Sequence, residues 1–169
     1  KMKYKPMLAY PVSSKPIDYN KPVFIQPKLD GVRCLIQYNK GYGVKAYSRT
    51  GKEWKNIDHI LEELVPFFTK HPNVVLDGEL YNHDFKDDFE QIISMVRKTK
   101  PTDEARWKSR RNVQFHCYDI VNKRMKFSTR DKWLASNLPE SYCVHLVATS
   151  KVTAEPAAKM THKINLANG

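Results

Sequence analysis

The sequence has few cysteines, and their spacing fits neither a disulfide framework nor a zinc site. Its three cysteines are Cys34, Cys117 and Cys143, an odd number with no CxxC pair and no Cys/His spacing. This usage argues against a small disulfide-stapled fold and against a structural zinc site. It is typical of a protein that works in a reducing compartment.

Long apolar runs, targeting signals and repeats are also missing. No stretch approaches the roughly 18 apolar residues of a membrane-spanning helix, and no signal-peptide core follows the first residues. The six histidines lack ligand spacing. No internal repeat or low-complexity tract interrupts the 169 residues, a length that suits one domain with one core.

Acidic residues are scarce relative to basic ones. The chain has 29 lysines and arginines against 18 aspartates and glutamates, a formal net charge of +11 and a sequence pI of about 9.5. Such a surplus on one small domain favours a polyanionic partner, with nucleic acid ahead of a membrane surface. The alternative is an ordinary basic surface that only improves solubility.

Hydrophobic periodicity indicates a mixture of strands and helices without strict alternation, which favours an α+β fold. We expect the first two strands to form a hairpin at Asp30-Gly31. Asn56 and Ser128 are expected to cap two of the helices. The first twenty residues read as an extended lead-in. The predicted strands are 22–28, 31–38, 43–49, 73–82, 113–121 and 142–148; the predicted helices begin at residue 57 and span 89–99, 128–138 and 154–167, with 102–111 a helix or loop.

Two short motifs combine charged residues with a glycine. Residues 28–33, KLDGVR, have the pattern KxDGxR, and residues 77–80 read DGEL in a hydrophobic strand. A hairpin turn needs an Asp-Gly pair, but it does not need Lys28 or Arg33. Taken alone, the first motif leaves open a hairpin whose turn happens to carry charge.

Three further segments accompany these motifs in order. They are SRTG at residues 48–51, FHCYDI at residues 115–120 and KPMLA at residues 5–9. Together the five segments resemble the superfamily of ATP-dependent DNA ligases and messenger-RNA capping enzymes. SRTG and KPMLA favour the phage and bacterial DNA ligases.

The resemblance implies a fold and a chemistry. The expected fold is an α+β, ATP-grasp-like nucleotidyltransferase (adenylation) domain with mixed and antiparallel sheets flanked by helices. Lys28 would attack the α-phosphate of ATP, giving a lysine–AMP intermediate. A lysine amine with its ordinary pKa of about 10.4 is almost wholly protonated at neutral pH, so it needs burial or neighbouring cations to react. Arg33, Arg49 and a magnesium ion would supply that positive field.

The resemblance also implies roles for other matched residues. Gln26 would read the adenine edge, Tyr118 would stack on adenine, and Glu79 would bind the ribose and help to hold Mg²⁺. Arg33 would contact the ribose and phosphates, and Asp30 lies close to the reacting atoms. The role of holding the 5′-phosphate of a DNA nick would go to Arg49 together with Ser48.

Simpler interpretations of these residues remain open. Tyr118 is alternatively a core side chain at a period-2 position, Glu79 a surface carboxylate, and Gln26 a solvent-facing strand residue. Asp77 is expected to shape the turn rather than to touch a ligand. Arg130, in the segment TRDKW, is a further candidate for the nucleotide pocket.

A basic run follows at residues 107–111, WKSRR. Its arginines, with one from the preceding turn, are candidates for contacts with the DNA backbone, a sequence-independent role that suits nick sealing. The alternative is a solvated helix face. The candidate residues are Arg106, Arg110 and Arg111.

Parts of the family pattern are not found. Residues 1–169 lack the EG and KxK motifs and an OB-fold domain, so we expect a partial adenylation domain that alone ligates weakly or not at all. The expected function is sealing of nicks in duplex DNA during replication or repair, by a monomer in a bacterial or phage-infected cytoplasm. The alternatives are a messenger-RNA guanylyltransferase and a non-catalytic nucleic-acid-binding module.

Overall fold

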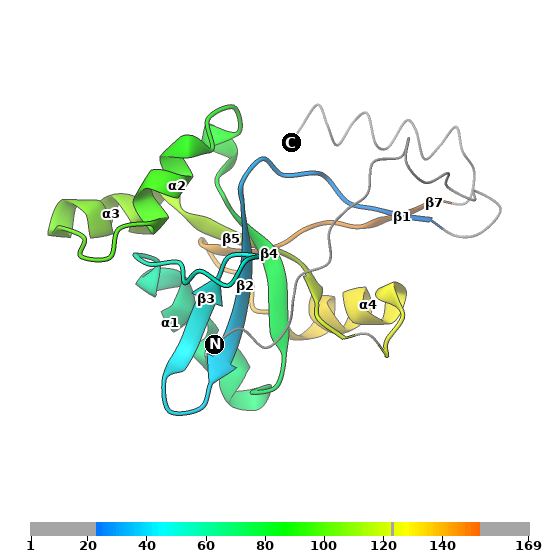
Figure 1. The fold of residues 1–169 in the computed structure, drawn as a ribbon. Coiled ribbons are helices and arrows are strands. Elements are labelled where there is room, and N and C mark those ends of the chain that lie inside the picture. The colour runs from blue at the N-terminus through cyan, green and yellow to red at the C-terminus, as the bar shows by residue number, and fades with distance from the viewer. Residues whose placement is uncertain (1–22, 123, 153–169) are drawn as a thin grey trace.

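Two β-sheets and four α-helices make up the computed structural model, which describes residues 23–122 and 124–152 (Figure 1). The five-stranded sheet has the order β3-β2-β4-β5-β6, and β1 pairs with β7 in a separate two-stranded sheet. Only β5 and β6 pair in parallel in the larger sheet. The elements are β1 (Val23–Ile25), β2 (Val32–Asn39), β3 (Gly43–Tyr47), α1 (Asp58–Lys70), β4 (Val75–Tyr81), the 3-10 helix η2 (His83–Phe85), α2 (Glu90–Val96), α3 (Asp103–Asn112), β5 (Gln114–Ile120), α4 (Phe127–Asn137), β6 (Val144–Leu146) and β7 (Ser150–Val152).

One face of the large sheet forms the hydrophobic core. Side chains alternate between the two faces of a strand, and Cys34 and Ile36 of β2 lie beside Gly78 and Leu76 of β4 on the core side. Helices α1, α2 and α4 contribute the other part of this core, with Phe68 of α1 almost fully buried. The opposite face is therefore left for the polar side chains of the same strands.

The sheet is irregular at the centre of β5. The pairing of β4 with β5 shifts between Asp77 and Gly78, so that Asp77 faces Asp119, Gly78 faces Cys117, and Tyr118 is the extra residue of a β-bulge. A bulge inserts one unpaired residue and so resets the alternation of the residues that follow it. Regular alternation from Cys117 in the core already places Tyr118 on the polar face, and the bulge lets Asp119 lie opposite Asp77 while Ile120 returns to the core.

The predicted hairpin at Asp30-Gly31 is wrong. β1 covers only part of the predicted strand 22–28, and it pairs with β7 rather than with β2. Gly31 has another role: a Cβ atom there would lie 2.4 Å from the carbonyl oxygen of Leu80. A glycine is therefore required because β2 begins against the backbone of β4.

Two predicted helix caps are also wrong. Ile57, not Asn56, precedes α1, and Lys126, not Ser128, precedes α4. Asn56 has a φ of +57°, and its side-chain amide donates hydrogen bonds to the carbonyls of Met95 and Ala105. Asn56 thus ties α2 and α3 to the start of α1.

The remaining element predictions are confirmed within a few residues wherever the structure describes them. The β2–β3 hairpin, β4, β5, β6 and the helices α1, α2 and α4 follow the predicted segments, and residues 102–111 form a helix capped by Thr102. β7 is an additional strand that periodicity did not predict. The lead-in, the KPMLA segment and the predicted helix 154–167 lie outside the described residues.

Among the helices of the described ranges, none is long and apolar enough to cross a membrane.

Candidate active site

The polar face of the large sheet brings together side chains from three adjacent strands. Arg33 of β2 lies directly opposite Glu79 of β4. Asp77 and Glu79 are two residues apart and share this face, and β5 adds Tyr118, which follows the core residue Cys117. The register therefore assembles three of the predicted site residues, Arg33, Glu79 and Tyr118, from segments far apart in the sequence.

Arg33 is held in a bidentate ion pair with Asp77. Its Nε and Nη2 atoms donate to Oδ1 and Oδ2 of Asp77, each at 2.7 Å. Its guanidinium also lies 5.3 Å from the centre of the Tyr118 ring. Burial disfavours the charged guanidinium, but the hydrogen bonds and charge of Asp77 outweigh this effect and raise the pKa of Arg33.

Asp77 lies inside β4, with an exposed fraction of only 2%. The expectation that it shapes a turn is therefore wrong. Burial raises the pKa of Asp77, and the ion pair with Arg33 opposes that shift. Its main role in this structure is to orient Arg33.

Glu79 combines burial with acidic neighbours. Loss of solvent raises the pKa of its carboxyl group to about 8, against the attraction of Arg33, and the nearby charge of Asp77 adds to the rise. Oε2 of Glu79 lies 3.3 Å from the position a Cβ would take at Gly31. Glu79 is thus neither a simple surface carboxylate nor remote from the KxDGxR segment.

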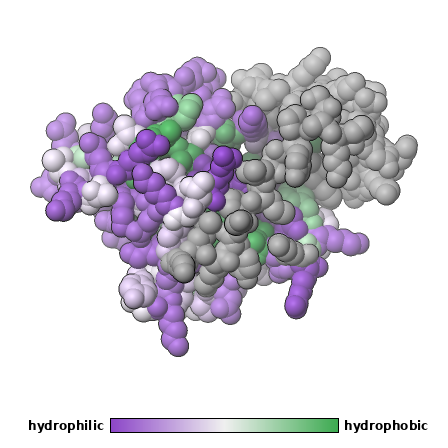
Figure 2. Space-filling model, viewed as in Figure 1, coloured by the Kyte–Doolittle hydropathy of each residue, from purple (hydrophilic) through white to green (hydrophobic). Residues whose placement is uncertain are grey.

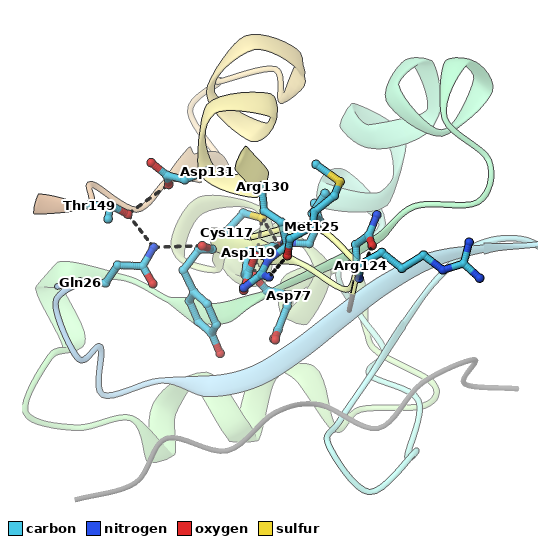
Figure 3. Close-up of polar contacts among 12 residues, drawn as sticks. Gln26, Asp77, Cys117, Asp119, Arg124, Met125, Arg130, Asp131 and Thr149 are labelled. Atoms are coloured by element: carbon cyan, nitrogen blue, oxygen red, sulfur yellow. Dashed lines mark hydrogen bonds and ion pairs between the residues drawn. The ribbon is translucent and has the colours of Figure 1, made fainter. Parts of the chain in front are cut away.

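The segment with the proposed nucleophile connects the two sheets. Lys28 and Asp30 are exposed, and they lie between β1, which is bound to β7, and β2 at the polar face. Gln26 anchors this segment, because its Nε2 donates to the backbone carbonyl of Tyr118 at 2.9 Å (Figure 3). The interpretation of Gln26 as a solvent-facing strand residue is therefore wrong.

Tyr118 is half-buried and lies outside the hydrophobic core cluster. The alternative that it is a core side chain is therefore excluded. Burial and the nearby charges of Asp77 and Glu79 raise the pKa of its hydroxyl group, so the phenol stays protonated. The ring thus lies beside the Arg33 guanidinium, on the face that carries Glu79.

The Arg130 guanidinium is bound by a different carboxylate and does not join Arg33, Glu79 and Tyr118. It makes a second bidentate ion pair, from Nε to Oδ1 of Asp119 at 2.8 Å and from Nη2 to Oδ2 at 3.1 Å (Figure 3). Its Nη1 donates to the carbonyl of Met125. Arg130 therefore connects α4 to the bulged strand, a role that its place in TRDKW did not reveal.

Ser48 and Arg49 lie on the turn that follows β3. The Ser48 hydroxyl group accepts a hydrogen bond from the backbone nitrogen of Lys52 at 3.0 Å, and Gly51 completes the turn with a φ of +95°. Ser48 is thus used by the turn itself, whereas the Arg49 side chain is exposed. Arg49 remains a predicted phosphate contact.

The three predicted DNA-contacting arginines lie on α3 and are exposed. Arg106 pairs with Asp103 at 2.7 Å, and the Arg111 guanidinium lies 4.7 Å from the ring centre of Trp107. Arg110 lines a shallow hollow with His59 and Trp107. This helix projects beside α2, away from the β1–β7 sheet (Figure 1).

The carboxylate oxygens of the polar face would bind Mg²⁺ only together with oxygen atoms of a bound substrate and water. In the ranges that the structure describes, no group of three or more His, Cys, Asp or Glu side chains is arranged to hold a metal ion. Mg²⁺ commonly binds through one or two carboxylates together with substrate phosphates and water. The half-buried carboxyl group of Glu79 fits such a site, and a cation would favour its ionisation.

Known proteins similar to this chain were found by sequence and by structure. The sequence model described as "ATP dependent DNA ligase domain" matches residues 6–166. The DNA ligase of Enterobacteria phage T4 is 36% identical over 87 residues, which are 46% of this chain and 18% of that protein. The match therefore covers about a fifth of the length of this curated relative.

Solved structures share the fold at lower identity. The ligase Pmar-Lig_PreS3 aligns with a TM-score of 0.68 and 22% identity, over 95% of this chain and 39% of that one. The ATP-dependent DNA ligase of bacteriophage T7, in complex with ATP, aligns with a TM-score of 0.55 and 15% identity, over 83% and 52%. With the family match over nearly the whole sequence, these comparisons show that the chain belongs to the ATP-dependent DNA ligase domain family.

Proposed function

We propose that these residues are the nucleotide-binding part of a DNA ligase that adenylylates Lys28 and seals nicks in duplex DNA. The observation that carries the proposal is the placement of the Lys28 segment against the polar face with Arg33, Glu79 and Tyr118. A nucleotide at this face would meet an aromatic ring, a cation and a metal-binding carboxyl group. Family membership supports ATP as that nucleotide.

Covalent chemistry begins at Lys28. Its neutral amine attacks the α-phosphorus of ATP, an N–P bond forms, and the bond to the bridging oxygen breaks, so that pyrophosphate leaves and the amine loses a proton. The 5′-phosphate at a nick then displaces the lysine from AMP. Finally the 3′-hydroxyl group attacks the 5′-phosphorus and releases AMP. Protein groups act mainly by positioning and by neutralising charge.

Each side chain of the polar face is proposed to contact a different part of the nucleotide. Tyr118 stacks on the base, since any flat aromatic ring offers such a surface, and Gln26 contacts the edge of the base. Arg33, oriented by Asp77, reaches the ribose and phosphates. Bound magnesium would neutralise phosphate charge, and Glu79, with Asp30 nearby, would hold it.

DNA contacts are assigned to two separate surfaces. Arg49, on the turn stabilised by Ser48, is proposed to bind the 5′-phosphate of the nick. Arg106, Arg110 and Arg111 are proposed to contact the backbone without reading sequence. The protein would act as a monomer in a bacterial or phage-infected cytoplasm, where its buried cysteines Cys34, Cys117 and Cys143 stay reduced.

Label transfer tests the proposal. Full-length protein is incubated with Mg²⁺ and α-labelled ATP and then run on a denaturing gel. We expect a labelled band with the natural sequence, no band with Lys28→Ala, and an undiminished band with Lys40→Ala, which removes an exposed lysine from the β2–β3 turn. Label from GTP instead would indicate a guanylyltransferase. DNA binding without label from either nucleotide would indicate a non-catalytic module.

A further inference from the structure

The side-chain amide of Gln26 is fixed by two partners from distant parts of the chain. Its Nε2 donates to the carbonyl oxygen of Tyr118 and to Oγ1 of Thr149, both at 2.9 Å. Thr149 lies just before β7, and its Oγ1 in turn donates to Oδ1 of Asp131 on α4 at 3.1 Å. Figure 3 shows the resulting chain Asp131–Thr149–Gln26.

The chemistry of the partners settles which end of the amide faces them. A backbone carbonyl can only accept a hydrogen bond, so the Tyr118 oxygen requires the amide nitrogen. The Thr149 hydroxyl group has a single hydrogen, which it gives to the acceptor-only carboxylate of Asp131. Thr149 is therefore an acceptor toward Gln26, and both amide hydrogens are used.

This arrangement leaves the amide oxygen as the group that Gln26 can offer to a ligand. In the described part of the chain, no residue donates a hydrogen bond to Oε1 of Gln26. Since Gln26 is bonded to the carbonyl of Tyr118 and lies two residues before Lys28, a base stacked on the Tyr118 ring has an edge near this oxygen.

We propose that Thr149 and Asp131 are positioning residues that orient Gln26 as a hydrogen-bond acceptor and so select a purine with a 6-amino group. The inference rests on the proposed function of nucleotide binding at Tyr118. Adenine donates a hydrogen bond from its 6-amino group. Hypoxanthine carries a 6-oxo group, which would place two acceptors against each other and leave both unsatisfied.

The test compares ATP with inosine triphosphate as the donor in Lys28 labelling by full-length protein. The readout is the ratio of kcat/KM for the two nucleotides, because a loss of folding lowers both values without changing their ratio. We expect Thr149→Val to reduce the preference for ATP about tenfold, mainly through KM for ATP. The matched Thr149→Ser variant keeps the hydroxyl group and should retain the natural ratio.

Asp131→Ala is the second variant. It frees the Thr149 hydroxyl hydrogen, so the preference for ATP should fall in the same direction by a smaller factor. An unchanged ratio in Thr149→Val, or in Asp131→Ala where Thr149→Val does not fold, would overturn this inference while leaving the proposed function intact. Absence of label from either nucleotide in the natural protein would instead overturn the proposed function, and the inference with it.

Discussion

The carboxyl group of Glu79 lies where burial and acidic neighbours both disfavour its ionisation. Its pKa of about 8 compares with an ordinary value of 4.5 in the unfolded chain. Between these values the folded protein binds more protons at this position than the unfolded chain does. The free energy of unfolding should therefore fall as the pH rises from about 4.5 to 8.

Glu79→Gln should remove this contribution, because an amide does not titrate. The wild-type free energy of unfolding should decline relative to that of the variant by at most about 1.4 kcal/mol per pH unit within that window. Chemical denaturation at a series of pH values measures it. Glu62→Gln, at an exposed position of α1, is the control. Parallel pH curves for wild type and Glu79→Gln would contradict the prediction.

At the scale of elements, the close contact between β4 and β5 depends on Gly78. A Cβ atom at this position would lie 2.3 Å from the carbonyl oxygen of His116 and 2.8 Å from the ring of Phe115. Neither the backbone of a central strand nor a fully buried ring can move aside cheaply. The bulge at Tyr118 lies in the same pairing.

Gly78→Ala should consequently lower the free energy of unfolding by about 3 kcal/mol or more. Gly41→Ala is the matched control, since Gly41 has a φ of +85° but no atom within 4 Å of the added Cβ. That change should cost only about 1 kcal/mol, from backbone strain. Urea unfolding of both variants gives the comparison. Equal losses of unfolding free energy in the two variants would show that the structure accommodates a Cβ at position 78, and would contradict the prediction.

Hydrophobic periodicity in the sequence predicted those strands and helices whose formation depends on neighbouring residues. Alternation placed β2, β4 and β5, and a period of two then required Arg33 and Glu79 to face away from Cys34 and Leu80. The pairing of β1 with β7 joins residues over 120 positions apart in the sequence, and no turn or periodicity signals it. The Asp30-Gly31 pair looked like a turn because close backbone packing also needs glycine.

The site, like the fold, could be predicted only in part from the sequence. The motifs named Lys28, Glu79 and Tyr118, yet the partners that orient the site residues come from segments without a motif. Thr149 and Asp131 reach Gln26 only through tertiary structure. Asn56 was taken for a cap because asparagine favours caps, but its positive φ and its bonds to α2 and α3 serve helix docking.

At the scale of the whole molecule, α3 contributes four basic residues to a chain with a net charge of +11. The end of the molecule formed by α3 is almost wholly hydrophilic on the face shown in Figure 2. Arg106, Arg110 and Arg111 are exposed there, and Trp107 beside them is 58% exposed. Exposed arginines are suited to phosphate contacts, and the Trp107 ring, 4.7 Å from the Arg111 guanidinium, helps to position one of them.

Replacing the three arginines with alanine should weaken DNA binding and reduce its salt dependence. Each phosphate contact adds about 0.9 to the slope of log K against log salt concentration, so three lost contacts lower the slope by up to about 3. The exposed pair of Arg106 with Asp103 is weak in water and does not prevent a phosphate contact.

The control must lose the same charge at another place, because a lower net charge alone weakens attraction to DNA. Lys40, Lys70 and Lys132 are exposed outside α3, and replacing all three removes three positive charges. Titration of full-length variants with duplex DNA at several salt concentrations then separates local contacts from overall charge. A smaller slope in the arginine variant alone would place phosphate contacts on α3; equal slopes in both variants would assign the effect to net charge and contradict the proposed surface.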